Sequence, residues 1–143
     1  MKPITVRIKL LSPVPLPKRQ TSGSAGFDLT AAQSTIIKAR SFATVSTGLA
    51  IELPKEIEAQ VRPRSGLAAA HGIGILNSPG TIDPDYRGEI KVILFNCSEK
   101  DFPVRQGDRI AQLVFSRAVL VNLQRVEHLS RTQRGTSGFG HTG

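Results

Sequence analysis

The sequence predicts an all-β protein, a jelly-roll-like barrel or sandwich with one short helix and a flexible glycine-rich C-terminal tail. Three observations predict this fold class. The apolar residues lie in many short runs, and several of these runs alternate with polar residues. Thirteen glycines and nine prolines interrupt the chain of 143 residues, which suits short strands better than long helices. Hydrophobic residues make up 39% and aromatic residues only 5%, so we expect a core of Val, Ile, Leu and Ala.

Nine segments are predicted to be strands because they alternate in polarity or form short apolar runs. In chain order they are residues 4–10, 34–37, 42–46, 49–51, 59–61, 73–75, 89–95, 110–116 and 119–126. Turn signals fall between several of them, at residues 38–40, 54–56 and 105–108. Only residues 65–70 have the pattern of a helix, with Ser65 as its expected N-cap and three alanines that favour helix.

The chain is expected to form a single domain over residues 1–143, because no internal repeat or linker divides it. Residues from about 130 to 143 are expected to form a mobile arm. Four glycines lie between Arg134 and Gly143. Glycine loses the most conformational entropy on ordering, so this segment is unsuited to a packed core.

The net charge of +8 suits either a nucleic-acid partner or a polyphosphate substrate. The basic residues are dispersed and form no run of Lys and Arg, so stable nucleic-acid binding is not expected. No apolar stretch approaches the roughly 20 residues of a membrane span, and the first residues lack a signal-peptide pattern. The single cysteine, Cys97, cannot form a disulfide within the chain. These features predict a cytoplasmic protein without membrane contact.

Three segments carry residue types suited to chemistry. The first is the bend at residues 80–90, in which Pro84 presets a turn and Gly88 lets the chain reverse. With the strand that follows, it is expected to form a rigid hairpin. Asp83 lies just before the tip and is a candidate general base, and Tyr86 can form an aromatic wall. The alternative is an ordinary surface hairpin.

The second segment, residues 62–70, is expected to bend into the short helix. Arg64 can bind phosphate oxygens bidentately and Ser65 can donate from its hydroxyl, close to the free N–H groups of a helix start. The alternative is a capped helix with solvated arginines.

The third segment is the glycine-rich tail, whose N–H groups can wrap phosphates while Phe139 stacks on a flat ring. The alternative there is a disordered tail.

Together with two further segments, these stretches resemble, in order, the five motifs of the homotrimeric dUTPase family (dUTP diphosphatases). The motifs correspond to residues 25–32, 62–68, 80–90, 107–113 and the tail from Arg134. Ser137 stands where the family usually has glycine. The resemblance covers the chain from about Ser24 onward. It implies a jelly-roll fold, a homotrimer whose active sites are shared between subunits, and Mg²⁺-assisted hydrolysis of dUTP to dUMP and diphosphate. This activity limits uracil incorporation into DNA and supplies dUMP for dTMP synthesis.

The resemblance also implies roles for individual residues. Asp83 would orient and deprotonate the water that attacks the α-phosphate, and Tyr86 would pack under the sugar and exclude a 2′-hydroxyl. Uracil would be recognised by Asn77 and the backbone of Thr81 and Ile82, although Asn77 is otherwise read as a turn residue. The remaining implied ligand positions are Arg64, Ser65, Gly66, Lys91, Gln112, Arg134, Ser137, Gly138 and Phe139, with Asp28 holding metal-bound water. Lys91 could instead point to solvent, and His141 is at most a minor tail contact.

Two rival interpretations remain. A dCTP deaminase shares the fold but places a catalytic glutamate on the strand after the bend, where this chain has Ile93, which cannot transfer a proton. A basic β-barrel that binds nucleic acid or protein without catalysis would explain the charge, but not five ordered motifs. Asp108 and Arg109 are expected to form a structural pair near a turn.

Overall fold

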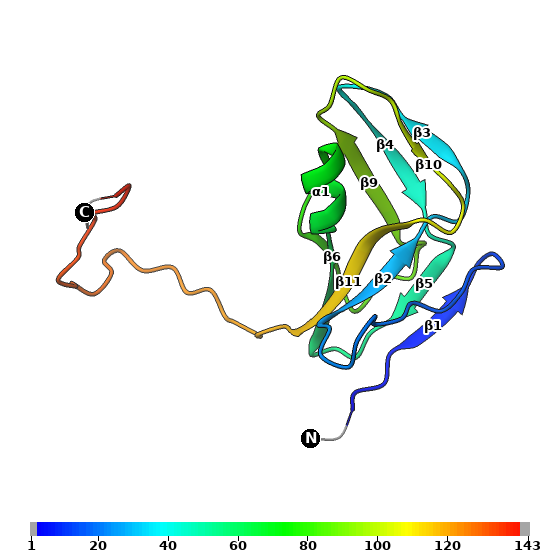
Figure 1. The fold of residues 1–143 in the computed structure, drawn as a ribbon. Coiled ribbons are helices and arrows are strands. Elements are labelled where there is room, and N and C mark those ends of the chain that lie inside the picture. Colours follow the sequence, from blue (N-terminus) through cyan, green and yellow to red (C-terminus); the bar gives the residue numbers. More distant parts are fainter. Residues whose placement is uncertain (1–2, 141–143) are drawn as a thin grey trace.

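The computed structural model describes residues 3–140, which form short strands and one helix (Figure 1). The strands within this range are β1 (Arg7–Leu10), β2 (Gly26–Thr30), β3 (Thr35–Ile37), β4 (Ser41–Ser46), β5 (Leu49–Glu52), β6 (Ile57–Arg62), β7 (Ile73–Ile75), β8 (Gly80–Ile82), β9 (Lys91–Asn96), β10 (Phe102–Val104) and β11 (Arg109–Arg117). The helix, α1 (Ser65–His71), lies between β6 and β7. The all-β prediction is confirmed. Within residues 3–140, no helix is long and apolar enough to cross a membrane.

Antiparallel pairing arranges the strands in four sheets. The two largest have the strand orders β2-β11-β6-β8 and β4-β9-β7, and the pairs β1-β5 and β10-β3 extend the structure at its edges. Neighbouring strands are often far apart in the sequence, since β2 pairs with β11 and β3 with β10. The chain therefore brings its first and last thirds together, and this places motifs from both ends next to one another.

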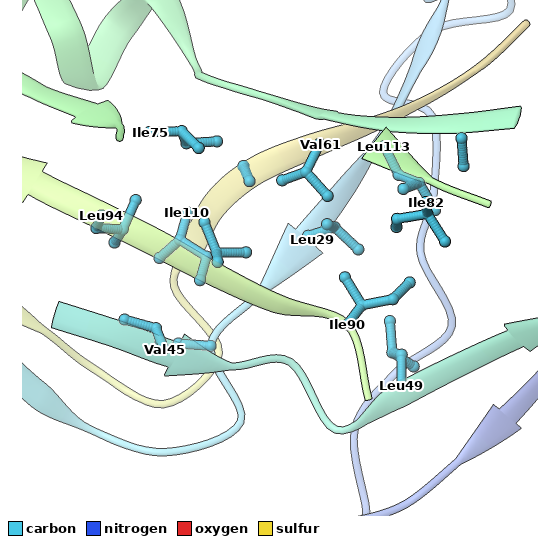
Figure 2. Close-up of a cluster of buried hydrophobic side chains, with 14 of the residues drawn as sticks. Leu29, Val45, Leu49, Val61, Ile75, Ile82, Ile90, Leu94, Ile110 and Leu113 are labelled. Carbon is cyan, nitrogen blue, oxygen red and sulfur yellow. The ribbon is translucent and has the colours of Figure 1, made fainter. Parts of the chain in front are cut away.

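The core lies between the two large sheets and is aliphatic, as expected. Alternation is regular in β6, where Ile57, Ala59 and Val61 are buried and the residues between them are partly exposed. Figure 2 shows side chains from both sheets meeting in one cluster; it includes Leu29, Val45, Val61, Ile75, Ile82, Ile90, Leu94 and Leu113. Each such side chain contributes about 1.5–3 kcal/mol when it leaves water, so the cluster makes the frame beneath the surface sites rigid.

The predicted strands and the observed strands differ in four places. Strands β2, β8 and β10 were not predicted. They are only three to five residues long, and β10 contains Pro103, which lacks the N–H that a strand normally donates. The predicted strand at residues 119–126 is wrong, because that segment pairs with no strand of the described chain and its Val and Leu side chains are exposed.

The predicted hairpin at residues 80–90 is also wrong. Strand β8 before the bend pairs with β6, and β9 after it pairs with β4 and β7. The bend is therefore a connection that crosses from one large sheet to the other. A crossing connection is anchored by two sheets, so its position is fixed more firmly than that of a protruding hairpin.

Helix α1 begins one residue earlier than the predicted cap at Ser65 implies. Arg64 occupies the N-cap position in an extended conformation, Ser65 is the first helical residue, and within the described chain no side chain caps this end. At the other end Gly72 adopts the left-handed conformation, and its N–H donates to Ala68 O at 3.0 Å. The backbone N–H groups of the first turn consequently stay available to an external acceptor.

Candidate functional site

A cavity of about 270 Å³ opens beside the bend that connects the two large sheets. It is lined by Thr44, Val61, Asn77, Gly80, Thr81, Ile82, Asp83, Tyr86, Glu89, Ile90, Lys91 and Ile93. Six of the predicted site residues, namely Asn77, Thr81, Ile82, Asp83, Tyr86 and Lys91, therefore share one cavity. Its size is close to the lower end of the usual range for ligand sites, ~300–1,000 Å³.

The walls of this cavity combine apolar and polar groups. Val61, Ile82 and Ile90 are buried core residues that also face the cavity. Asn77 and Asp83 supply an amide and a carboxylate at exposed positions. An apolar floor with a few convergent polar groups is typical of a site for a small flat molecule with a polar edge.

The bend holds Tyr86 in place through its own backbone. The Tyr86 hydroxyl donates to Glu89 O at 3.0 Å, and the Tyr86 N–H donates to Asp83 O at 3.2 Å. The ring folds back over Gly88, where any Cβ would overlap the tyrosine hydroxyl. Gly88 therefore leaves room for the close approach of the Tyr86 ring, and its own φ is not in the left-handed region.

Two further contacts make the bend rigid. The Arg87 guanidinium donates to Pro84 O at 2.6 Å and to Tyr86 O at 3.0 Å, which closes the turn across its own backbone. The Glu89 carboxylate accepts a hydrogen bond from the Gly48 N–H at 3.0 Å, which ties the bend to the loop between β4 and β5. Neither Arg87 nor Glu89 was singled out from the sequence as a residue that shapes the site.

A second group of predicted residues lies on the outer face of the β2-β11-β6-β8 sheet. Pairing places Asp28, Gln112 and Arg62 side by side on three neighbouring strands. The Gln112 amide donates to Pro63 O at 3.0 Å, and its side chain crosses Gly26, where a Cβ would overlap Oε1 of Gln112. Gly26, in the first motif, thus leaves room for the side chain of Gln112, in the fourth motif.

Asp28 lies at the centre of a network of charged groups. Its Oδ2 accepts from Arg109 Nη1 at 3.2 Å, and its Oδ1 lies 3.8 Å from Arg64 Nε. Arg64 also donates through Nη1 to Arg109 O at 3.0 Å. The expected pair of Asp108 and Arg109 does not form, since Asp108 instead accepts from Arg105 N at 2.8 Å and closes the turn before β11.

The side chains near Asp28 suit a metal ion that binds together with a phosphate ligand. Over residues 3–140, no three His, Cys, Asp or Glu side chains are grouped closely enough to hold an ion by themselves. The Asp28 carboxylate already faces two guanidinium groups. A magnesium ion here would be bound mainly by phosphate oxygens and water, with Asp28 outside its direct ligand shell.

In the structure the arm comprises residues 118–140, which follow β11 and include the described part of the segment predicted from about residue 130. It carries the third group of predicted residues. Beyond β11 the chain runs away from the sheets in an extended path (Figure 1). Arg134 closes a short turn, in which its Nε donates to Ser137 O at 2.8 Å. Gly138 is half-buried and the Phe139 ring is fully exposed. His141 lies outside the described residues.

The predicted site residues therefore form three separate groups. The cavity at the bend includes neither Arg64, Ser65 and Gly66 nor Gln112 among its lining residues. Arg64 instead lines a different hollow of about 310 Å³ beside Arg109 and Asp108. The arm lies apart from both (Figure 1). The sequence did not single out Thr44, which has no local motif and lines the cavity because β4 pairs with β9.

Comparison with known proteins gives a consistent result. The family model described as dUTPase matches residues 12–143. A deoxyuridine 5'-triphosphate nucleotidohydrolase of Helicobacter hepaticus is 51% identical over 144 residues, which covers 100% of this chain and 91% of that protein. The enzyme of the same name from Rickettsia bellii is 55% identical over 130 residues, covering 90% and 87% of the two chains.

Solved structures show the same fold. A dUTPase of Staphylococcus bacteriophage 80alpha, solved as a point mutant with dUpNHpp, has a TM-score of 0.90 at 24% identity and covers 97% of this chain and 98% of its own. The same phage enzyme with dUpNHpp and 25% identity has a TM-score of 0.88, with coverage of 97% and 98%. With a family match over nearly the whole chain and relatives at about half identity, the chain belongs to the dUTPase family.

Proposed function

We propose that this protein hydrolyses dUTP to dUMP and diphosphate by attack of water on the α-phosphate. The observation that carries the proposal is the cavity at the bend, which joins one exposed carboxylate, one aromatic ring and one amide above an apolar floor. The relatives bearing the name deoxyuridine 5'-triphosphate nucleotidohydrolase support the same reaction.

Base and sugar would be recognised within this cavity. The Asn77 amide and the backbone of Thr81 and Ile82 can supply donors and acceptors to the uracil edge. Tyr86 would lie against deoxyribose, because its hydroxyl is bonded to Glu89 O and its ring cannot swing away freely. A 2′-hydroxyl would then meet the ring, and ribonucleotides would be rejected. The Lys91 Nζ lies 3.8 Å from Glu89 Oε2 and the side chain is half-exposed, so it can face a phosphate or solvent.

Asp83 would act as the general base. Its side chain lines the cavity and is exposed, so water can reach it. A positioned carboxylate that accepts a proton from the attacking water contributes typically about 10²–10⁴-fold. At position 93 the cavity presents an isoleucine, which offers no group for proton transfer to the base, so the cavity suits hydrolysis and not deamination.

The phosphates would be bound by the second group of residues. Arg64, with Ser65 and Gly66 at the start of α1, offers a guanidinium, a hydroxyl and free backbone N–H groups, and Gln112 lies beside them. When bound, Mg²⁺ would neutralise charge on the phosphate oxygens, and Asp28 would hold its water ligands.

From the arm, Arg134 would face developing negative charge and Phe139 would cover the uracil, with Ser137 and Gly138 against the phosphates.

A homotrimer would complete the site, because one subunit keeps the three groups of residues apart. Val119, Leu120, Leu123 and Leu129 on the arm are 80–96% exposed, and such a series of apolar side chains requires a surface to cover it. The arm of one subunit would close over the cavity of another, with the helix start coming from a neighbouring chain.

The test is release of diphosphate from dUTP, compared with dCTP, dTTP and UTP, with and without Mg²⁺. We expect turnover of dUTP alone, and its loss when the metal is chelated. Sedimentation would report the trimer. Comparable turnover of dCTP, or release of ammonia, would contradict the proposed reaction.

A further inference from the structure

The turn at residues 18–21 lies against β2 and reaches the charged network of Asp28. Lys18 O accepts from the Asp28 N–H at 2.9 Å, and Gln20 Nε2 donates to Asp28 Oδ2 at 2.7 Å. No sequence motif marks Gln20, and none of the roles described above uses it. The turn therefore touches the charged network both through the backbone and through one side chain.

The turn is anchored independently of Gln20. The Arg19 guanidinium lies 5.4 Å from the centre of the Phe27 ring, and that ring packs edge-on against Phe115 at 5.7 Å. On the other side, Ser24 N donates to Thr21 O and Thr21 N donates to Ser24 Oγ, both at 3.2 Å, so the backbone of Thr21 closes the turn. The Thr21 and Ser24 hydroxyls, 2.9 Å apart, add a contact that the turn does not depend on. Gln20 is thus presented from a fixed backbone.

Gln20 donates to the same oxygen of the Asp28 carboxylate as Arg109, and it does so at the shorter distance. Oδ2 is shared by Gln20 and Arg109, which leaves Oδ1 directed toward Arg64 Nε at 3.8 Å. A carboxylate is planar, so fixing one oxygen fixes the direction of the other. The side chains of Asp28 and Arg64 are only 16% and 26% exposed, which makes this electrostatic contact stronger than one at an open surface.

We propose that Gln20 is a positioning residue that acts through Asp28 to direct the Arg64 guanidinium toward the triphosphate. Without the amide, Oδ2 is held by Arg109 alone, so the carboxylate can turn and carry Oδ1 away from Arg64, which keeps its bond to Arg109 O. The inference rests on the proposed function, because it assumes that Arg64 binds phosphate.

The kinetic test compares Gln20→Ala and Gln20→Glu with Thr21→Ala, a control in the same turn that does not contact Asp28. Gln20→Ala should raise KM for dUTP about 3–10-fold with kcat within about twofold, because a hydrogen bond to a charged group is removed. Gln20→Glu should raise it further, since it sets a second carboxylate against Asp28. Thr21→Ala should leave KM unchanged.

A double-mutant cycle separates positioning from simple folding effects. In an Asp28→Asn background, Gln20→Ala should change KM by less than twofold, because its route to Arg64 is already broken. Equal effects of Gln20→Ala in both backgrounds would overturn the inference, as would an unchanged KM in Gln20→Ala or an equal rise in Thr21→Ala. The midpoints of thermal unfolding should match between the two alanine variants.

A second measurement does not depend on turnover. The ¹⁵N-labelled Nε–H signal of Arg64, assigned by its loss in Arg64→Lys, should shift in Gln20→Ala and stay in place in Thr21→Ala. If the wild-type protein fails to hydrolyse dUTP, the proposed function is wrong while this signal still tests the orientation of Arg64. An Arg64 signal that is unmoved by Gln20→Ala would overturn the inference in either case.

Discussion

The bend at residues 83–90 and the arm at residues 118–140 both carry side chains suited to a nucleotide, but only the bend is held in shape by its own chain. Arg87 and Tyr86 close the bend across its backbone. Ile90 N donates to Leu49 O at 2.7 Å, and the Ile90 side chain is 2% exposed. The bend is therefore specified by local bonds and by the core beneath it.

The arm has almost none of this support. Its base is tied to the body by Ala118 N, which donates to Glu56 O at 2.9 Å. Farther along, Leu123 is 96% exposed and Phe139 is fully exposed. Its apolar residues are arranged as for a strand, yet within residues 3–140 no edge accepts it. The comparison indicates that the bend is supported within the subunit, whereas the arm finds no supporting surface among residues 3–140; in the proposed trimer a second copy would supply it.

The largest expected effect is at the bend. Asp83→Asn should reduce kcat by about 10²–10⁴-fold while dUTP binding and the unfolding midpoint stay near those of the wild type, because the amide keeps the shape but cannot accept the proton. Steady-state release of diphosphate and calorimetric binding would measure both quantities. Asp85→Asn is the matched control, since Asp85 lies on the same bend but does not line the cavity. Near-normal turnover in Asp83→Asn would remove this residue from the mechanism.

Removal of residues 134–143 should have the next largest effect. The sheets and the proposed trimer should persist, because none of residues 134–140 belongs to the hydrophobic core. We expect turnover to fall by roughly 10²-fold or more, since closure over the substrate excludes water and Arg134 supplies positive charge.

Mixed trimers test whether the arm acts across subunits. Chains truncated at residue 133 would be combined with Asp83→Asn chains, and mixed assembly would be verified by mass. Some sites would then pair an intact Asp83 with an intact arm from another chain, so part of the activity should return. If verified mixed trimers stay inactive, each site would have to be built within one subunit, and the distinction between bend and arm would fail.

A smaller effect is expected at Tyr86, which tests whether the rigid bend selects deoxyribose over ribose. Tyr86→Ala should raise kcat/KM for UTP relative to dUTP by about 10–100-fold, because the ring that would collide with a 2′-hydroxyl is gone. Tyr86→Phe keeps the ring and loses only the hydrogen bond to Glu89 O, so it should retain most of the discrimination. Continued exclusion of UTP by Tyr86→Ala would show that another group selects the sugar.

The elements that could be predicted from the sequence are those with strong local patterns. Strands β4, β6, β7, β9 and β11 follow the alternation or the apolar runs that predicted them. Strand β2 was recognised only as a motif, because Phe27 and Leu29 give too short an alternation around Gly26 and Asp28. The segment at residues 119–126 has the composition of a strand but lacks an edge within its own chain, so a local pattern could not decide its structure.

In the candidate site, too, the residues that a local motif brings together could be predicted, and those that depend on strand pairing could not. The residues of the bend cavity are close in sequence, and a motif was sufficient to bring most of them together. The network of Asp28, Arg64 and Arg109 depends on the register of β2 with β11, which no local pattern encodes. For this reason Arg109 was assigned the wrong partner and Gln20 was overlooked.

The smallest expected effect concerns the arm and compares two equivalent truncations of aliphatic side chains. Ile90→Ala, at the last residue of the bend, should lower the free energy of unfolding by about 2–5 kcal/mol, because it leaves a cavity in a packed core. Leu123→Ala should change the stability of the isolated subunit by less than about 0.5 kcal/mol, since that side chain is 96% exposed.

Protein concentration separates these two truncations. Thermal unfolding would be measured for both variants at two concentrations roughly 100-fold apart, because stability gained from association depends on concentration and stability gained within a subunit does not. The deficit of Ile90→Ala should be present at both concentrations. The deficit of Leu123→Ala should appear only where the trimer forms, together with weaker association in sedimentation. A deficit of Leu123→Ala that is equally large in the dilute sample would mean that Leu123 packs within its own subunit, and the arm would then be supported in the same way as the bend.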